Sequence, residues 1–173
     1  MKMSRVLALL ISALVLATCL PNGSAFAQGY RFPRTRQVKV YFPKDGDSPD
    51  PQNNPSNLQP VTRLVNLAAP LRPAVEALLA GPTRAEERQG FMALDVSGLR
   101  IVKVAVNRGT AYASFAHRRG TGWAGDLSPF TFGDAVELTL KQFPNVRRTV
   151  VCVDGVTNFG DESGGPAKKC PRF

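Results

Sequence analysis

The residues that could carry out bond-making chemistry are few. His117 is the only histidine of the chain, and it stands beside Arg118 and Arg119 in a stretch whose glycines predict a loop. A single histidine in such a loop is typical of a solvated side chain rather than of a catalytic base. One histidine also provides too few ligands for a zinc site built from His and Cys. The sequence therefore predicts neither a histidine-based catalytic site nor a metal site.

The acidic residues show no pairing typical of acid–base catalysis. The closest pairs, Glu86–Glu87 and Asp161–Glu162, are adjacent in sequence, the first at a predicted helix start and the second in the C-terminal tail. Carboxylates near a helix N-terminus complement its dipole, which predicts a capping role for the first pair. The glycines between residues 117 and 126 lack the Lys-Ser/Thr sequence of a phosphate-binding loop. We predict no catalytic residue and no cofactor; the alternative, a periplasmic wall-modifying hydrolase, requires a cleft in which carboxylates converge.

One segment resembles a nucleic-acid-binding strand. Residues 108–115 are similar to the RNP1 strand of RNA-recognition motifs, and the chain is basic, with a pI near 10.0. However, Thr110 stands where the motif supplies a base-stacking ring. Tyr112 on one face and the apolar residues on the other are also what a packed hairpin requires. Nucleic-acid binding is thus an alternative function, which an exposed Tyr112 on an open sheet face would favour.

The first 27 residues have the pattern of an export signal. Lys2 and Arg5 precede an apolar run at residues 6–17, which is too short to span a membrane. Ala-Phe-Ala at 25–27 has the small-x-small pattern of a cleavage site, so we expect cleavage after Ala27. One alternative is an uncleaved anchor, and another is lipidation of Cys19, which would attach the protein to a membrane. We therefore expect an exported protein, periplasmic or extracellular, with a lipoprotein at Cys19 as the alternative.

Two cysteines follow the export signal, Cys152 and Cys170. An even pair in an oxidising compartment predicts a disulfide. Such a bond would hold the C-terminal tail against the last apolar strand. Two free thiols and a metal site are the alternatives, and the absence of a nearby histidine argues against the metal site.

The chain is strongly basic, because 22 Lys and Arg oppose 13 Asp and Glu, a formal net charge of +9. Outside the cytoplasm, the natural counter-charges are anionic lipids, wall polymers such as peptidoglycan, and acidic proteins. A contribution to solubility alone would explain the charge equally well. The candidate contacts for an anionic partner are Arg31, Arg34, Arg36, Arg118, Arg119, Arg147 and Arg148.

Hydrophobic periodicity predicts strands that alternate with two main helices. The predicted strands cover residues 38–42, 61–67, 101–106, 111–115 and 146–153, the third and fourth forming a hairpin. The apolar stripe of the first helix consists of Leu71, Val75, Leu78 and Leu79, and that of the second of Phe132, Val136, Leu140 and Phe143. This order predicts an α/β (α+β) fold, a small mixed sheet with both helices packed on one face.

Changes in composition divide the chain. We expect a signal peptide at 1–27, a flexible basic lead-in at 28–37, one folded domain at 38–155 and a disulfide-tethered tail at 156–173. Within the domain, residues 44–60 hold four prolines among polar residues, which predicts a long surface loop. Thr-Arg-Ala-Glu at 83–86 has the pattern of a capping box.

Short motifs in the domain carry a resemblance to a known family. They are Val40-Tyr41-Phe42, Val61-Thr62-Arg63, Leu78-Leu79-Ala80-Gly81-Pro82-Thr83 followed by Glu86 or Glu87, Gly90-Phe91, Thr139-Leu140-Lys141-Gln142-Phe143-Pro144-Asn145-Val146 and Val153-Asp154-Gly155. In this order and spacing, residues 38–155 resemble the GerMN (sporulation and spore germination) domain. Two positions depart from the pattern: Asp95-Val96 where the family often has Ile-Pro, and Ser114 where it often has an aspartate.

The resemblance implies a fold similar to ring-building modules and an interaction role in envelope or spore-assembly proteins. It carries no established catalytic residues. Together with the export signal, it leads us to expect a non-catalytic interaction or scaffold module of the bacterial cell envelope. The expected partner is an envelope protein or an anionic polymer such as peptidoglycan.

Overall fold

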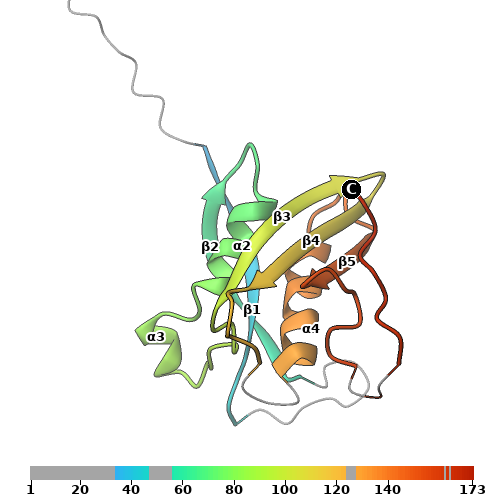
Figure 1. Cartoon of the computed structure of the whole chain (residues 1–173). Helices are drawn as coiled ribbons and strands as arrows, with labels where there is room; N and C mark the ends of the chain where they lie inside the picture. Colours follow the sequence, from blue (N-terminus) through green and yellow to red (C-terminus); the bar gives the residue numbers. More distant parts are fainter. Residues whose placement is uncertain (1–33, 47–55, 124–127, 162, 164) are drawn as a thin grey trace, which may run out of the picture. The chain divides into compact units, whose positions relative to one another are not determined.

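The computed structural model describes residues 34–46, 56–123, 128–161, 163 and 165–173 (Figure 1). The expected signal peptide, with its cleavage site after Ala27 and the alternative site at Cys19, lies outside these residues. The elements are β1 (Thr35–Pro43), β2 (Leu58–Asn66), α2 (Leu71–Leu79), α3 (Arg84–Glu87), β3 (Leu99–Asn107), β4 (Thr110–His117), α4 (Ser128–Lys141) and β5 (Arg148–Val153). Within the described part, no helix has both the length and the apolar character needed to cross a membrane.

The strands form two sheets. β1 and β2 pair antiparallel, whereas β4 pairs antiparallel with β3 and parallel with β5. The predicted mixed α/β class is confirmed, although the single expected sheet is divided. One reason is visible at β1, where the Gln142 side chain donates to Lys39 O (2.6 Å) and accepts from Lys39 N (2.7 Å). These bonds use backbone groups of β1 with which a further strand would have paired.

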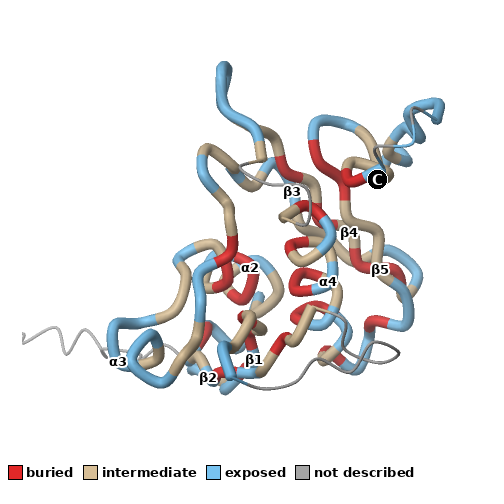
Figure 2. The backbone as a smooth tube through the Cα atoms, turned by 90° about the horizontal axis from the view of Figure 1, so that it is seen from below, coloured by how far each residue is buried: buried red, intermediate tan, exposed pale blue. Residues whose placement is uncertain are grey.

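Helices α2 and α4 connect the two sheets through one core. α4 packs against α2, β1 and β5, and α2 packs against β1, β2 and β3. Figure 2 shows the buried residues gathered along both helices and the strands around them. The predicted stripe of α4 is confirmed, since all four of its residues are at most 2% exposed: Phe132, Val136, Leu140 and Phe143.

Strand pairing extends the first hairpin beyond its predicted ends. β1 begins at Thr35, inside the segment expected to be a flexible lead-in, and β2 begins at Leu58, inside the expected loop. Pro60 lies opposite Tyr41 in this pairing. A proline is tolerated there because an edge strand does not need all of its N–H donors. Local composition therefore underestimated strands that are completed by their partners.

The tail folds back on the end of β5. Cys152 and Cys170 form the predicted disulfide, with Cα atoms 6.1 Å apart, and Cys152 is fully buried. Cys170 N donates to Gly155 O (2.9 Å), and Val156 bridges both to Val153 and to Lys169. The tail thus continues the fold beyond β5 and brings residues 157–161 beside α4.

Candidate functional site

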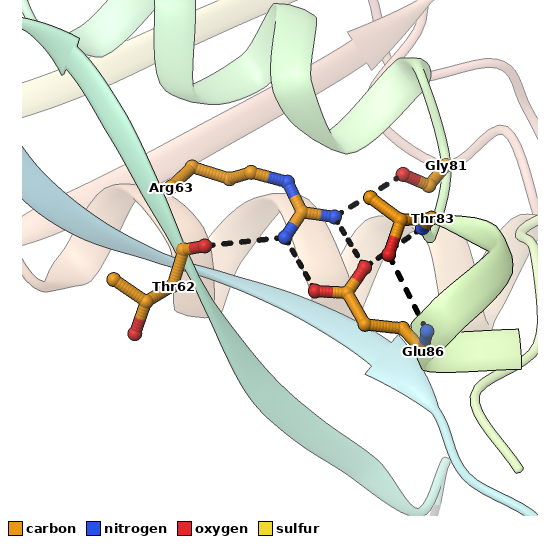
Figure 3. A network of polar contacts seen from close by, with 5 residues as sticks. All are labelled: Thr62, Arg63, Gly81, Thr83 and Glu86. Carbon is orange, nitrogen blue, oxygen red and sulfur yellow. Dashed lines mark hydrogen bonds and ion pairs between the residues drawn. The ribbon is translucent and has the colours of Figure 1, made fainter. Parts of the chain in front are cut away.

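A polar network joins β2 to the segment between α2 and α3 (Figure 3). The Arg63 guanidinium donates two hydrogen bonds to Glu86, at 2.6 Å to Oε1 and 2.7 Å to Oε2. It also donates to the backbone oxygens of Thr62 (3.2 Å) and Gly81 (3.4 Å). Thr83 and Glu86 form the predicted capping box of α3. The arginine of β2, the Gly-Pro-Thr motif and the following glutamate therefore fix one chain connection.

The Arg63–Glu86 ion pair is well shielded, with each side chain 18% exposed. The hydrogen bonds from Arg63 are the main cause that lowers the pKa of Glu86 from 4.5 to about 2, and the capping contacts of Thr83 add to them. Glu86 is ionised in the folded state and cannot serve as a general acid near neutral pH. These motif residues have a structural role.

Two predicted arginine pairs lie at opposite ends of β4. The backbone N–H groups of Arg147 and Arg148 donate to Gly109 O (2.8 and 3.1 Å), in the turn where β4 begins. Arg118 and Arg119 follow the other end of the strand. Because a strand rises about 3.3 Å per residue, the 8 residues of β4 separate the two pairs by roughly 25 Å. The predicted arginines do not form a single patch.

Two further arginines lie on other elements, Arg36 on β1 and Arg108 in the β3–β4 turn. The Arg36 guanidinium of β1 is 5.4 Å from the ring of Phe143, in the connection between α4 and β5. Arg108, which the sequence analysis did not single out, lies in the β3–β4 turn with a φ of 48°. We call the arginines around this turn the basic end, and it consists of Arg108, Arg147 and Arg148.

Within the part of the chain that the structure describes, none of the three arginines of the basic end forms an ion pair. The Arg147 guanidinium lies close over the turn, because a Cβ added at Gly109 would be 2.8 Å from Arg147 Nε. Of the remaining predicted arginines, Arg34 lies immediately before β1, and Arg31 is outside the described residues. The charge at this end is therefore available to a partner.

His117 is not the solvated loop residue that the sequence analysis expected. It is the last residue of β4, and its side chain is 10% exposed. Its Nδ1 lies 2.6 Å from Asp154 Oδ2, and its backbone N–H donates to Asp154 Oδ1 (2.9 Å). The Trp123 ring packs against the imidazole, with the ring centroids 5.1 Å apart. Burial alone would raise the pKa of Asp154, but the hydrogen bonds from His117 outweigh it and hold that pKa below its usual value.

The His117–Asp154 pair lacks the third group of a nucleophilic site. The other ring nitrogen, Nε2, is buried and has no hydrogen-bond partner among the described residues. A serine or cysteine nucleophile would have to contact this atom. The pair instead links the end of β4 to the turn after β5. Sequence reasoning missed it because Asp154 is far from His117 along the chain.

An open cleft of about 580 Å³ lies between α4, β5 and residues 157–161 of the tail. Its walls include two aromatic rings, Phe130 and Phe159, and three carboxylates, Asp134, Glu137 and Asp161. We call it the acidic cleft. Among the described residues that line it, none is a lysine, an arginine or a histidine.

Two carboxylates of the acidic cleft, Asp134 and Glu137, each have one side-chain partner among the described residues. Asp134 accepts one hydrogen bond from Ser56 Oγ (2.8 Å), and Glu137 pairs with Lys141 one turn along α4. Hydrogen bonds from Ser163 are the main cause that lowers the pKa of Asp161. In the part of the chain that the structure describes, no three acidic, His or Cys side chains are close enough to hold a metal ion. The arrangement suits attraction of a positive charge.

Comparison with known proteins identifies the domain. Residues 39–158 match the family model Germane, described as "Sporulation and spore germination". The chain belongs to this family. The predicted GerMN resemblance is thereby confirmed, and it covers both the basic end and the larger part of the acidic cleft. No curated protein matches the chain.

Solved structures of Germane-type domains share the fold. The tandem GerMN domains of the sporulation protein GerM from Bacillus subtilis match with a TM-score of 0.52 at 20% identity, covering 79% of this chain and 45% of that chain. This chain thus spans less than half the length of the tandem-domain chain. The first GerMN domain of the same protein covers 79% of this chain and 94% of its own, with 16% identity and a TM-score of 0.44. At such identities the likeness shows the fold alone.

The Germane family is not a known enzyme family. The hydrolase alternative requires one carboxyl whose pKa is raised so that it can donate a proton. In the acidic cleft, the pKa of Asp161 is shifted in the opposite direction. The sequence analysis missed the cleft because its acids come from α4 and from the tail. The spacing of Asp134 and Glu137, three residues apart on one helix, was the available indication.

Tyr112 lies neither beneath a helix nor fully open to solvent. It is on the face of β4 opposite the buried Ala111 and Ala113, and Phe173 of the tail stacks on its ring with centroids 4.5 Å apart. Lys103 contacts this aromatic pair, with Nζ 4.7 Å from the Phe173 ring centroid. The ring that would stack a nucleic-acid base is therefore occupied by the tail.

Proposed function

We propose that this Germane domain is an exported, non-catalytic interaction module of the bacterial cell envelope. It binds an anionic partner through the basic end, and the partner is a wall polymer or an acidic protein. The observation that carries the proposal is that arginines from the β3–β4 turn and the start of β5 meet at Gly109 and form no ion pair among the described residues. The export pattern of residues 1–27 supports an envelope location.

The basic end suits planar anionic groups. Guanidinium groups bind carboxylates and phosphates with two parallel hydrogen bonds, which a lysine cannot do. α4 ends next to this region, and the negative end of its dipole stabilises nearby positive charge. Since the screening length is about 8 Å at physiological ionic strength, contacts made by exposed arginines weaken as salt is added.

Retention on purified cell walls tests the proposal. The triple variant Arg108→Gln, Arg147→Gln, Arg148→Gln should lower retention at low salt by about tenfold, as expected when several charge-assisted contacts are lost. The matched control is Arg118→Gln with Arg119→Gln, which removes charge at the other end of β4. Equal losses in both variants, or retention that is unchanged in high salt, would contradict binding at the basic end.

Export has its own measurement. The intact mass of the protein recovered from expressing cells should correspond to a chain that begins at Gln28 and lacks the two hydrogens of the disulfide. A mass that shows a lipid on Cys19 would instead indicate a membrane-anchored protein. A mass that includes residues 1–27 would contradict cleavage.

A further inference from the structure

The acidic cleft is lined by negative charge, although the chain as a whole is positively charged. The chain carries 22 Lys and Arg, yet the walls of its open cleft contain none of them and contain three carboxylates. A volume of about 580 Å³ is within the range of small-ligand sites. The cleft is therefore both large enough to receive a ligand and opposite in charge to the rest of the protein.

The aromatic walls are an observation independent of the acids. Phe130 is 52% exposed although it lies on a helix that packs into the core. The ring of Phe159 is supported by Trp123, whose ring stacks on it with the centroids 6.1 Å apart. The cleft thus presents one exposed ring and one supported ring, and the face of such a ring attracts an alkyl chain or a cation.

The backbone approaches these rings closely. A Cβ added at Gly160 would lie 3.2 Å from the Phe130 ring, and one at Gly133 would lie 3.5 Å from the Phe159 ring. The two glycines let the aromatic side chains lie flat against the neighbouring segment. Their packing fixes the shape of the cleft without a ligand.

Two neutral polar side chains of the cleft, those of Thr157 and Asn158, are already used inside the tail. Asn158 Oδ1 accepts from Lys168 N (2.7 Å), and Thr157 Oγ1 donates to Lys168 O (3.3 Å). The carboxylates of Asp134 and Glu137 each make one contact through a side chain and can accept more. A ligand would therefore meet carboxylates, aromatic rings and the Thr149 hydroxyl rather than a free side-chain amide.

We propose that the acidic cleft binds an alkylammonium side chain, such as that of lysine or another diamino acid within a peptide. Its ammonium group contacts the carboxylates of Asp134 and Glu137 on α4, while its aliphatic stem lies against Phe130 and Phe159. A peptide, rather than a free amine, fits the size of the cleft, which exceeds one side chain. This site shares no residue with the basic end and does not depend on the proposed function.

The first test uses two capped tripeptides and the full chain. Acetyl-Ala-Lys-Ala-amide should perturb backbone NMR signals of residues lining the cleft, with a Kd on the order of 1 mM, as expected for a small ligand. Acetyl-Ala-norleucine-Ala-amide has the same stem without the ammonium group and should bind at least about tenfold more weakly, because the charge-assisted hydrogen bonds are lost. Equal affinities, no binding of the lysine peptide, or perturbations confined to another surface would overturn the proposal.

Variants assign the contribution of each wall. Asp134→Asn with Glu137→Gln should weaken binding of the lysine peptide about tenfold, and Phe130→Ala about threefold. Glu76→Gln is the matched control, since Glu76 forms an exposed ion pair within α2, away from the cleft. Affinity that is unchanged in the double variant, with the fold retained by circular dichroism, would overturn the proposal.

A second ligand pair distinguishes the source of the ammonium group. A wall-derived peptide with the free amino group of its diamino acid, and the same peptide acetylated at that group, replace the two tripeptides. Preference for the free wall peptide over the lysine tripeptide indicates a wall ligand, and the reverse indicates a protein segment. Arg108→Gln, in the β3–β4 turn, should leave these affinities unchanged while it weakens retention on cell walls, so failure of one proposal does not affect the other.

Discussion

The basic end and the acidic cleft are built along the same helix from opposite charges. α4 leads into the basic end, whereas Asp134 and Glu137 in its earlier turns line the cleft. The C-terminal end of a helix dipole favours positive charge, which agrees with the basic end, whereas Asp134 and Glu137 lie in the middle turns of α4, where the dipole has little effect. The two regions also differ in construction: the basic end consists of exposed side chains, and the cleft is shaped by packed aromatic rings. Loss of packing should therefore affect the cleft first.

The largest expected effect comes from a core substitution that destabilises the whole fold and therefore both the basic end and the acidic cleft. Phe132 is fully buried and packs edge-on against Phe115 and beside Trp123, which supports the cleft. Phe132→Ala should lower the free energy of unfolding by about 3–5 kcal/mol, because it leaves a cavity in the core. Denaturation in urea measures the change. Phe130→Ala on the same helix is the control and should cost less than about 1 kcal/mol, since that ring is half exposed; equal losses would contradict this account of the core.

Removal of the disulfide should weaken binding at the acidic cleft and leave binding at the basic end intact. Replacing both cysteines with alanine, Cys152→Ala with Cys170→Ala, opens a bond that spans 18 residues and should cost about 3 kcal/mol. The tail supplies Phe159 and Asp161 to the cleft, so binding of the lysine peptide should weaken while retention on cell walls persists. Isothermal titration and the wall assay measure the two quantities. A loss of wall retention alone would reverse the assignment of the tail to the cleft.

The Arg63–Glu86 pair should affect stability and neither binding region. Glu86 has a folded pKa of about 2 against an ordinary value of 4.5, so the unfolded chain takes up a proton first as the pH falls. The contribution of the pair is then fully present above about pH 4.5 and is lost as the pH falls towards 2. Glu86→Gln should cost about 2–3 kcal/mol at neutral pH and flatten this part of the pH profile.

An exposed pair gives the control for that prediction. Arg72→Ala breaks the Arg72–Glu76 pair, whose side chains are about half exposed, and should cost no more than about 0.5 kcal/mol. Thermal unfolding between pH 2 and 7 compares the variants. A pH profile of the Glu86→Gln variant that parallels the unsubstituted protein would refute the role of this carboxylate.

The smallest expected effect sharpens the description of the basic end. Gly109 has a φ of +80° and lies against the Arg147 guanidinium, so Gly109→Ala adds both backbone strain and a collision with that side chain. The cost should be about 1–2 kcal/mol, with wall retention reduced by displacement of Arg147. Gly120→Ala has the same φ with open space around its Cβ, and it isolates the strain. Identical wall retention in the two variants would show that the position of Arg147 is unimportant.

Much of the fold could be predicted because it depends on local patterns. The stripe of α4 and the capping box at Thr83 follow from spacing along one helix, and both are present. The division into two sheets could not be predicted, since alternation shows which face of a strand is buried but not which strand is its neighbour. Gln142, whose side chain covers the edge of β1, is distant from that strand in sequence.

For the candidate sites too, local sequence predicted some features and only the fold decided the others. Residue type identified Arg147 and Arg148 as candidates, but only the turn at Gly109 brought Arg108 beside them. Composition predicted a solvated His117, and the fold buried it against Asp154. The acidic cleft had no single motif, because its carboxylates come from separate segments.

The sequence by itself determined the amphipathic helices, the strand-forming segments, the cysteine pair and the Germane family pattern, all of which depend on neighbouring residues or on residue type. The tertiary structure alone decided which charges meet. Long-range packing of α4 against the tail collected acids into a cleft, and the pairing of β5 with β4 brought arginines to the hairpin turn. The physical reason is that electrostatic interactions depend on distance in space, which sequence separation does not set.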